Sequence, residues 1–207
     1  MKQELLTRFP SLSACEQQLD AATQALIACF ENGGKLLLCG NGGSCADCEH
    51  IVGELMKGFL KMRPLDAITR ADMTARCDAV APLLDRLQGG LPAVSLPSFA
   101  ALNSAFCNDV DPELIYAQPL MGLGRAGDIL LAISTSGNSK NVVAAVKVAK
   151  ALGLTVIGLT GQSGGAIKSF ADITVCAPET ETFKVQELHL PVYHYLCAAV
   201  EQHFFKQ

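Results

Sequence analysis

Five short stretches of the chain are almost entirely apolar, and polar residues do not alternate within them. Leu, Ile, Val, Ala and Cys dominate each stretch, which is typical of a strand buried on both faces, as in a parallel sheet. The predicted strands are residues 35–39, 93–96, 128–133, 155–159 and 172–176.

Helical patterns lie between and around these strands. Residues 138–152 place Val142, Val146 and Ala149 on one side of a helix, which stops at Gly153. Longer helices are predicted over residues 11–32 and 181–206. This alternation indicates an α/β fold: a doubly wound, five-stranded parallel sheet flanked by helices. No linker divides the sequence, so we expect one domain over residues 1–207.

Residues 63–91 do not fit a minimal strand–helix alternation. Their apolar residues roughly follow helical spacing: Leu65, Ile68, Val80, Leu83, Leu84 and Leu87. We predict an inserted helix or helical hairpin that ends at Gly89 and Gly90. A mobile loop is the alternative, which the apolar stripe disfavours.

Composition and charge narrow the class of protein. Half of the 207 residues are hydrophobic, and the formal charge of −4 argues against a surface that coats nucleic acid. No apolar run is long enough to suggest a membrane span, and residues 1–10 do not resemble a signal peptide. We therefore expect a cytoplasmic protein that binds neither nucleic acid nor membrane.

Nine cysteines, an odd number, agree with that expectation because several lie inside apolar runs. Free buried thiols in a reducing compartment fit better than a disulfide framework. The Cys45-x-x-Cys48 pair admits a redox or zinc interpretation, but we favour two small helix residues because no second such pair follows.

Two strand ends carry similar small-residue loops. Residues 40–44, GNGGS, follow the first strand, and residues 134–139, STSGNS, follow the third. A loop of this kind before a helix presents backbone N–H groups and the positive end of the helix dipole, which suits a phosphate. Neither is a dinucleotide or Walker fingerprint. One such loop alone is more often a turn with an N-cap, but two favour a sugar-phosphate site.

The remaining chemistry lies on two predicted helices. His50 and Glu54 are four residues apart and share a helix face, so they can ligate zinc, share acid–base work or form a surface hydrogen bond. The last helix gathers Gln186, Glu187, His189 and His194 around Pro191, which can bend the helix. Glu187 and His194 are better aligned than Gln186 and His194. For His189 and His203 we favour packing or solvent exposure.

Together these motifs resemble the sugar isomerase (SIS) domain family, and within it the phosphoheptose isomerase branch. The first motif is GNGGS followed by His50-x-x-x-Glu54, and the second is Asn108-Asp109. The third is the STSGNS loop, and the fourth is the run of residues 186–189 followed by His194. The four occur in the family's order, across nearly the whole chain. This chain departs from the family pattern in two places. Residues 63–91 are longer than the connection that the resemblance implies, and Gly58, beside Lys57, stands where the family often has an arginine.

The resemblance also implies roles for individual residues. Those that would line or hold the sugar phosphate are Asn41, Gly42, Gly43, Glu54, Asn108, Asp109, Ser134, Thr135, Ser136, Ser139 and Gln186. Those that would bind one zinc ion are His50, Glu54, Gln186 and His194. Glu54 and His194 would form the acid–base pair, and the family's homotetramer would place sites between subunits.

The implied activity is ketose–aldose isomerisation of sedoheptulose 7-phosphate to a D-glycero-manno-heptose 7-phosphate through an enediol. One alternative is isomerisation of another phosphosugar. The other is a non-catalytic phosphosugar-binding protein, or one that associates with the replication initiator as a sister branch does. Retention of Glu54 and His194 favours an enzyme.

Overall fold

The five predicted strands form one sheet, in which all neighbours are parallel. The computed structural model describes residues 1–205. The strands are β1 (Leu36–Gly40), β2 (Ala93–Ser95), β3 (Ile129–Ser134), β4 (Thr155–Thr160) and β5 (Ile173–Cys176), in the order β2-β1-β3-β4-β5. In the register, Leu36 pairs with Ala93 on one side and Ile129 on the other. The α/β prediction is confirmed, with strand ends within one residue of those predicted.

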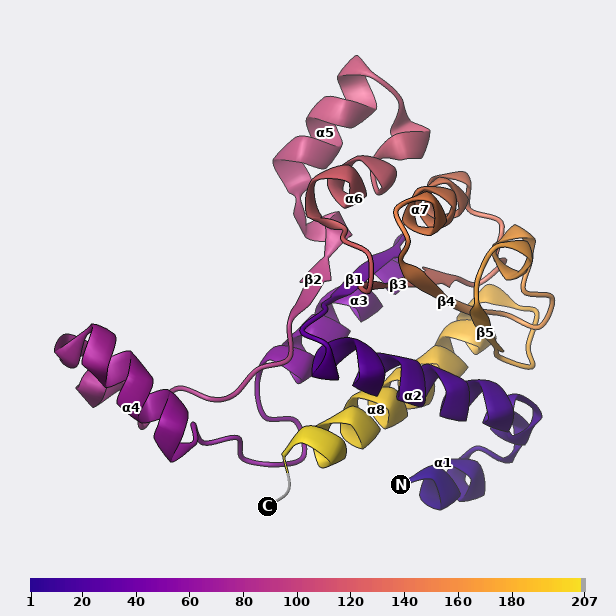
Figure 1. Cartoon of the computed structure of the whole chain (residues 1–207). Coiled ribbons are helices and arrows are strands. Elements are labelled where there is room, and N and C mark those ends of the chain that lie inside the picture. The colour runs from indigo at the N-terminus through magenta and orange to yellow at the C-terminus, as the bar shows by residue number, and fades with distance from the viewer. Residues whose placement is uncertain (206–207) are drawn as a thin grey trace.

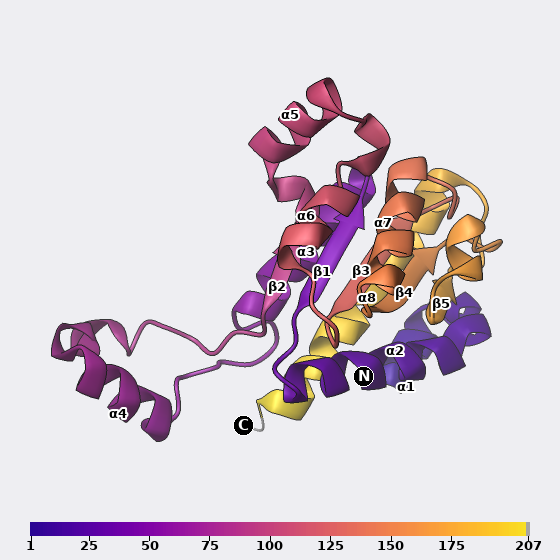
Figure 2. The same cartoon turned by 45° about the horizontal axis from the view of Figure 1, so that its top comes forward.

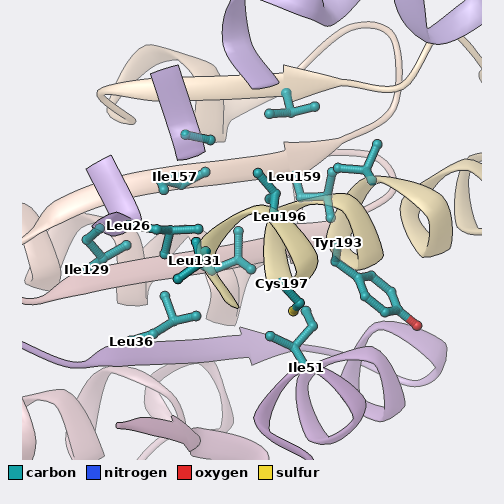
Figure 3. Close-up of a cluster of buried hydrophobic side chains, with 14 of the residues drawn as sticks. Leu26, Leu36, Ile51, Ile129, Leu131, Ile157, Leu159, Tyr193, Leu196 and Cys197 are labelled. Carbon is teal, nitrogen blue, oxygen red and sulfur yellow. The ribbon is translucent and has the colours of Figure 1, made fainter. Parts of the chain in front are cut away.

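Helices cover both faces of the sheet, as a doubly wound fold requires (Figure 1). One face carries α2 (Glu16–Glu31), α3 (Gly43–Met56) and α8 (Thr182–Phe204), and the other carries α6 (Ala117–Leu123) and α7 (Lys140–Ala151). Side chains alternate between two cores: Leu36 and Leu38 face α2, α3 and α8, whereas Leu37 and Cys39 face the opposite layer. Figure 3 shows the first core, where Leu196 and Cys197 of α8 pack among strand residues. Burial on both faces explains the continuous apolar runs.

The predicted terminal helices are present with different limits. The segment 11–32 is a 3₁₀ helix, Pro10–Cys15, followed by α2, and an additional α1 (Lys2–Arg8) precedes it. The last helix continues through Pro191 to Phe204, and residue 206 of its predicted range lies outside the described residues. Between β2 and β3, the sequence patterns missed α5 (Ala100–Asp109) as well as α6. The other 3₁₀ helices are Asp78–Leu83, Leu96–Ser98, Pro112–Leu114 and Ala166–Ser169.

Residues 63–91 form a helical arm that projects away from the sheet (Figures 1 and 2). It contains α4 (Ala67–Arg76), whose N-cap Asp66 accepts a hydrogen bond from the Thr69 amide, and the 3₁₀ helix Asp78–Leu83. The predicted helix is confirmed, but the helical part of the arm ends at Leu83 and not at Gly89 and Gly90. Its apolar stripe is mostly not buried: Ile68 is 82% exposed. A bridge between Pro64 and Gln88 closes the base of the arm. Across residues 1–205, no helix has both the length and the apolar character needed to cross a membrane.

His189 is packed inside the molecule, as predicted. Its side chain on α8 is fully buried, its Nε2 lies 3.2 Å from the Thr160 carbonyl oxygen, and burial lowers its pKa to about 4. An unfolded histidine titrates near pH 6.5, so the unfolded chain binds more protons between pH 4 and 6.5. Stability is therefore lost as the pH falls through this window.

We expect His189 alone to lower the free energy of unfolding by about 2 kcal/mol between pH 7 and pH 5. Urea unfolding of the wild type and His189→Gln at both pH values measures this effect. The variant should lose less stability on acidification than the wild type does. An equal loss in both proteins would contradict the assignment.

Candidate active site

The two small-residue loops lie side by side because they follow neighbouring parallel strands. Gly40, the last residue of β1, pairs with Ile133 of β3, so both loops leave the sheet at its carboxyl edge. This edge is where open α/β sheets bind ligands. Gly42 has a positive φ of 56° and is the N-cap of α3, a conformation that glycine adopts without strain.

Internal hydrogen bonds shape the second loop. The Ser134 and Ser139 hydroxyl oxygens are 3.0 Å apart, and the backbone N–H of Asn138 donates to the Ser136 hydroxyl over 3.1 Å. Ser136 is exposed, Thr135 is half-buried, and Ser134 is buried at the bottom of the loop. The loop therefore presents hydroxyls and backbone N–H groups of the kind that bind phosphate.

Residues outside the sequence motifs hold the first loop. The side-chain amides of Asn41 and Asn141 exchange two hydrogen bonds of 2.8 and 2.9 Å, which tie the first loop to α7. The Tyr116 hydroxyl donates to the Gly40 carbonyl and lies 3.0 Å from Asn41 Oδ1. Sequence reasoning missed Asn141 and Tyr116, and only the position of Asn141 just after the STSGNS loop could have suggested it.

Gln186 closes over the first loop from α8. A Cβ atom added to Gly43 would lie 2.6 Å from Gln186 Nε2, so the amide sits directly against the glycine. The pair links the first turn of α3 to the start of α8. The structure thus brings Asn41, Gly42, Gly43 and Gln186 together at the carboxyl edge of the sheet.

Glu54 and His194 lie in one cluster, contributed by helices α3 and α8. Glu54 Oε1 is 3.2 Å from His50 Nε2, and Glu54 Oε2 is 3.2 Å from the Lys57 ammonium. The His50 and His194 ring centroids are 5.1 Å apart. The centroid of the Phe59 ring is 5.5 Å from the centroid of the His194 ring.

The surroundings of His194 favour a neutral imidazole. Burial lowers its pKa, and the nearby His50 lowers it further, while Glu54 opposes both. His194 Nε2 is buried and has no hydrogen-bond partner in residues 1–205. A buried polar atom without a partner is costly, and its cost is removed when a ligand or ion binds it.

The cluster borders a cavity of about 470 Å³ between α1, α8 and the segment after α3. Its walls are largely apolar, with Leu5, Phe59 and Leu190 among them, and Glu187 and His194 also line it. Glu187 is exposed, so this rival partner for His194 lies at the surface, whereas Glu54 is largely buried.

Two predicted groups lie away from the cluster within one chain. Gln186 precedes His194 by eight helical residues, about 12 Å along α8, and contacts Gly43 instead. Asn108 and Asp109 end α5, where both are exposed and hydrogen-bonded to each other over 2.8 Å. Figure 2 shows α5 beyond the arrowhead of β1, at the carboxyl edge of the sheet.

The side chains of the cluster are of the types that bind zinc, but one chain does not supply a complete set of ligands. Two imidazoles and a carboxylate are typical zinc ligands, and the unpartnered His194 Nε2 is a free donor atom. Within residues 1–205, no three His, Cys, Asp or Glu side chains form a finished metal site. Cys45 and Cys48 are free thiols on α3 and do not complete one.

Comparison with known proteins agrees with the motifs. One SIS domain family model matches residues 3–89 and another matches residues 101–199. The phosphoheptose isomerase of Roseiflexus sp. strain RS-1 is 35% identical over 187 residues, which span 90% of this chain and 82% of that protein. The phosphoheptose isomerase of Helicobacter pylori strain P12 is 34% identical over 94% of this chain and 88% of its own length.

Solved structures give the same result. The phosphoheptose isomerase of Neisseria gonorrhoeae superposes with a TM-score of 0.76 at 30% identity, over 97% of this chain and 94% of that one. The enzyme of Francisella tularensis gives a TM-score of 0.78 at 31% identity, over 94% and 91% of the two chains. The chain therefore belongs to the SIS domain family, in its phosphoheptose isomerase branch.

Proposed function

We propose that this protein is an aldose–ketose isomerase that converts sedoheptulose 7-phosphate into D-glycero-manno-heptose 7-phosphate. Relatives and structural neighbours named phosphoheptose isomerase, matched over most of their length, support this function. The observation that carries it is the cluster of Glu54 with His194, whose lowered pKa keeps it neutral. A carboxylate and a neutral imidazole are a competent pair for moving protons near pH 7.

In the proposed reaction, Glu54 removes a proton from C1 of the ketose. The electron pair of that C–H bond forms the C1=C2 double bond, and His194 donates a proton to the C2 carbonyl oxygen, which gives the cis-enediol. In the second half, Glu54 returns its proton to C2, and His194 takes the proton of the C1 hydroxyl. The product is the aldose, and both side chains return to their starting states.

We assign the phosphate to the loops at the carboxyl edge, with Ser134, Thr135, Ser136 and Ser139 as its partners. Asn41, Gly42 and Gly43 would line the sugar beside it, together with Gln186. Contacts with this non-reacting group contribute binding energy that positions the reacting carbons.

We further propose that the functional unit is a homotetramer whose sites combine two subunits. Gly43 and Glu54 are eleven positions apart on α3, about 16 Å along the helix, which exceeds an extended seven-carbon chain of ordinary single bonds. This separation supports a phosphate held by one copy and an acid–base pair supplied by another. Asn108 and Asp109, at the tip of α5, would then reach the sugar hydroxyls in the assembled site.

One zinc ion is the proposed cofactor, held by His50, Glu54 and His194 together with a Gln186. When bound, zinc would polarise the substrate carbonyl as a Lewis acid. A cytoplasmic location is also proposed, which the nine free thiols support.

A screen of five- to seven-carbon ketose phosphates with the purified, zinc-loaded protein tests the function. We expect turnover of sedoheptulose 7-phosphate above all others. Preference for a different ketose phosphate would reassign the substrate. Bound zinc with no turnover of any of them would favour a non-catalytic binding protein.

A further inference from the structure

Tyr193 links the two helices of the candidate site through its hydroxyl group. It precedes His194 on α8, and its side chain is 1% exposed. Figure 3 shows its ring leading out of the apolar core, with the hydroxyl pointing away from the other labelled side chains. The hydroxyl oxygen lies 2.9 Å from His50 Nδ1 and 3.3 Å from Asp47 Oδ1, both on α3.

The hydroxyl has one proton, and the two neighbours compete for it. A phenol hydroxyl is protonated at neutral pH, because the ordinary pKa of tyrosine is near 10. A carboxylate has no proton to give and can only accept, whereas a neutral imidazole nitrogen can donate or accept. With a neutral imidazole, the arrangement that satisfies both contacts of the hydroxyl has Tyr193 donating to Asp47 and His50 Nδ1–H donating to Tyr193.

This arrangement decides what His50 presents to the site. With the proton on Nδ1, His50 Nε2 carries a lone pair and faces Glu54 Oε1 at 3.2 Å. Two electron-rich atoms at this distance repel each other unless a proton or a cation lies between them. Second-sphere partners of this kind are the usual means of orienting a metal-binding histidine.

We propose that Asp47 and Tyr193 form a positioning relay that holds His50 in its Nδ1–H tautomer. In this tautomer, His50 Nε2 and the Glu54 carboxylate together can bind a divalent cation. This inference deepens the zinc site of the proposed function and rests on it. Tyr193 and Asp47 act through His50 and are positioning residues, since neither need touch the substrate.

Tyr193→Phe removes the hydroxyl alone and keeps the buried ring, so it is the direct test. We expect zinc affinity, measured by competition with a chromophoric chelator, to fall by about 10–100-fold. Two-bond ¹H–¹⁵N correlation spectra of the metal-free proteins should show His50 as the Nδ1–H tautomer in the wild type. In the variant, the tautomer should shift toward Nε2–H, which can donate to Glu54.

Tyr195→Phe is the matched control, because it makes the same change two residues further along α8, at a half-buried ring. It should leave zinc affinity and the His50 tautomer as they are in the wild type. Asp47→Asn retains an acceptor oxygen and should have a smaller effect on zinc affinity than Tyr193→Phe.

A folded Tyr193→Phe protein with wild-type zinc affinity and an unchanged His50 tautomer would overturn the relay. The result is separable from the proposed function. A wild type that shows the relay in both measurements but isomerises no ketose phosphate would refute the function and leave the relay standing.

Discussion

Replacing Glu54 with glutamine lowers kcat by about 10²–10⁴-fold on this account, the range that a positioned general base contributes. Glutamine has nearly the same shape but cannot accept the C1 proton. The fall should appear in kcat and in kcat/KM together, because the lost interaction is made in the transition state. His194→Gln should cause a loss of similar size. Steady-state assays with sedoheptulose 7-phosphate measure both.

Glu187→Gln is the matched control for these variants. Glu187 is the rival carboxylate near His194, but it is exposed at the rim of the cavity. We expect its replacement to leave kcat near the wild-type value. A large loss in Glu187→Gln with little loss in Glu54→Gln would reverse the assignment of the base.

The second large effect concerns the buried ion pair of Arg63 and Glu201. Arg63 Nε donates to Glu201 Oε1 over 2.9 Å, and its two terminal nitrogens donate to the carbonyl oxygens of Leu55 and Glu54. Neither charged side chain is more than 1% exposed. Burial alone would raise the pKa of Glu201, but amide hydrogen bonds from the loop after α3 and the guanidinium lower it. The pair joins the end of α3, which carries Glu54, to α8.

We expect Arg63→Met to lower the free energy of unfolding by about 3–5 kcal/mol, because it leaves a buried carboxylate without its partner charge. Adding Glu201→Gln to this variant removes the orphaned charge and should recover part of the loss. Urea unfolding of the three proteins at pH 7 measures both changes.

Arg70→Met provides the comparison for an exposed pair. Arg70 contacts Asp85 on the projecting arm over 2.6 Å, where the carboxylate is 78% exposed. Exposed pairs contribute about 0–1 kcal/mol, so this variant should be nearly as stable as the wild type. Equal losses in Arg63→Met and Arg70→Met would mean that the buried pair has no special part in holding α3 against α8.

The strands could be predicted from the sequence because the sheet is covered on both faces. Each run, such as residues 36–40, must be apolar at every position, and short runs of this kind between turn residues are typical of buried parallel strands. Helices α5 and α6 were missed because α5 has no buried residue and α6 is short, so neither shows an apolar stripe of useful length. In the arm, the apolar spacing predicted a helix correctly. Spacing alone does not reveal whether another part of the protein packs against an apolar side chain such as Ile68, which is exposed.

The candidate site also has a part that local sequence spacing predicts and a part that it does not. His50 and Glu54 were predictable as neighbours because four residues make one helical turn. Their approach to His194 depends on how α3 packs on α8, which is a tertiary property that no local pattern encodes. Tyr193 was hidden for the same reason, since its partners Asp47 and His50 lie more than 140 residues earlier in the chain. The family resemblance supplied what local spacing could not.

Solvent exchange during turnover tests the central claim most directly. The zinc-loaded protein is incubated with sedoheptulose 7-phosphate in D₂O, and the sugar phosphates are followed by ¹H NMR. We expect the wild type to give a manno-heptose 7-phosphate with deuterium at C2 and a recovered ketose with deuterium at C1. Glu54→Gln should incorporate deuterium at neither position. Isomerisation at the wild-type rate in Glu54→Gln, with the same deuterium content, would contradict the account.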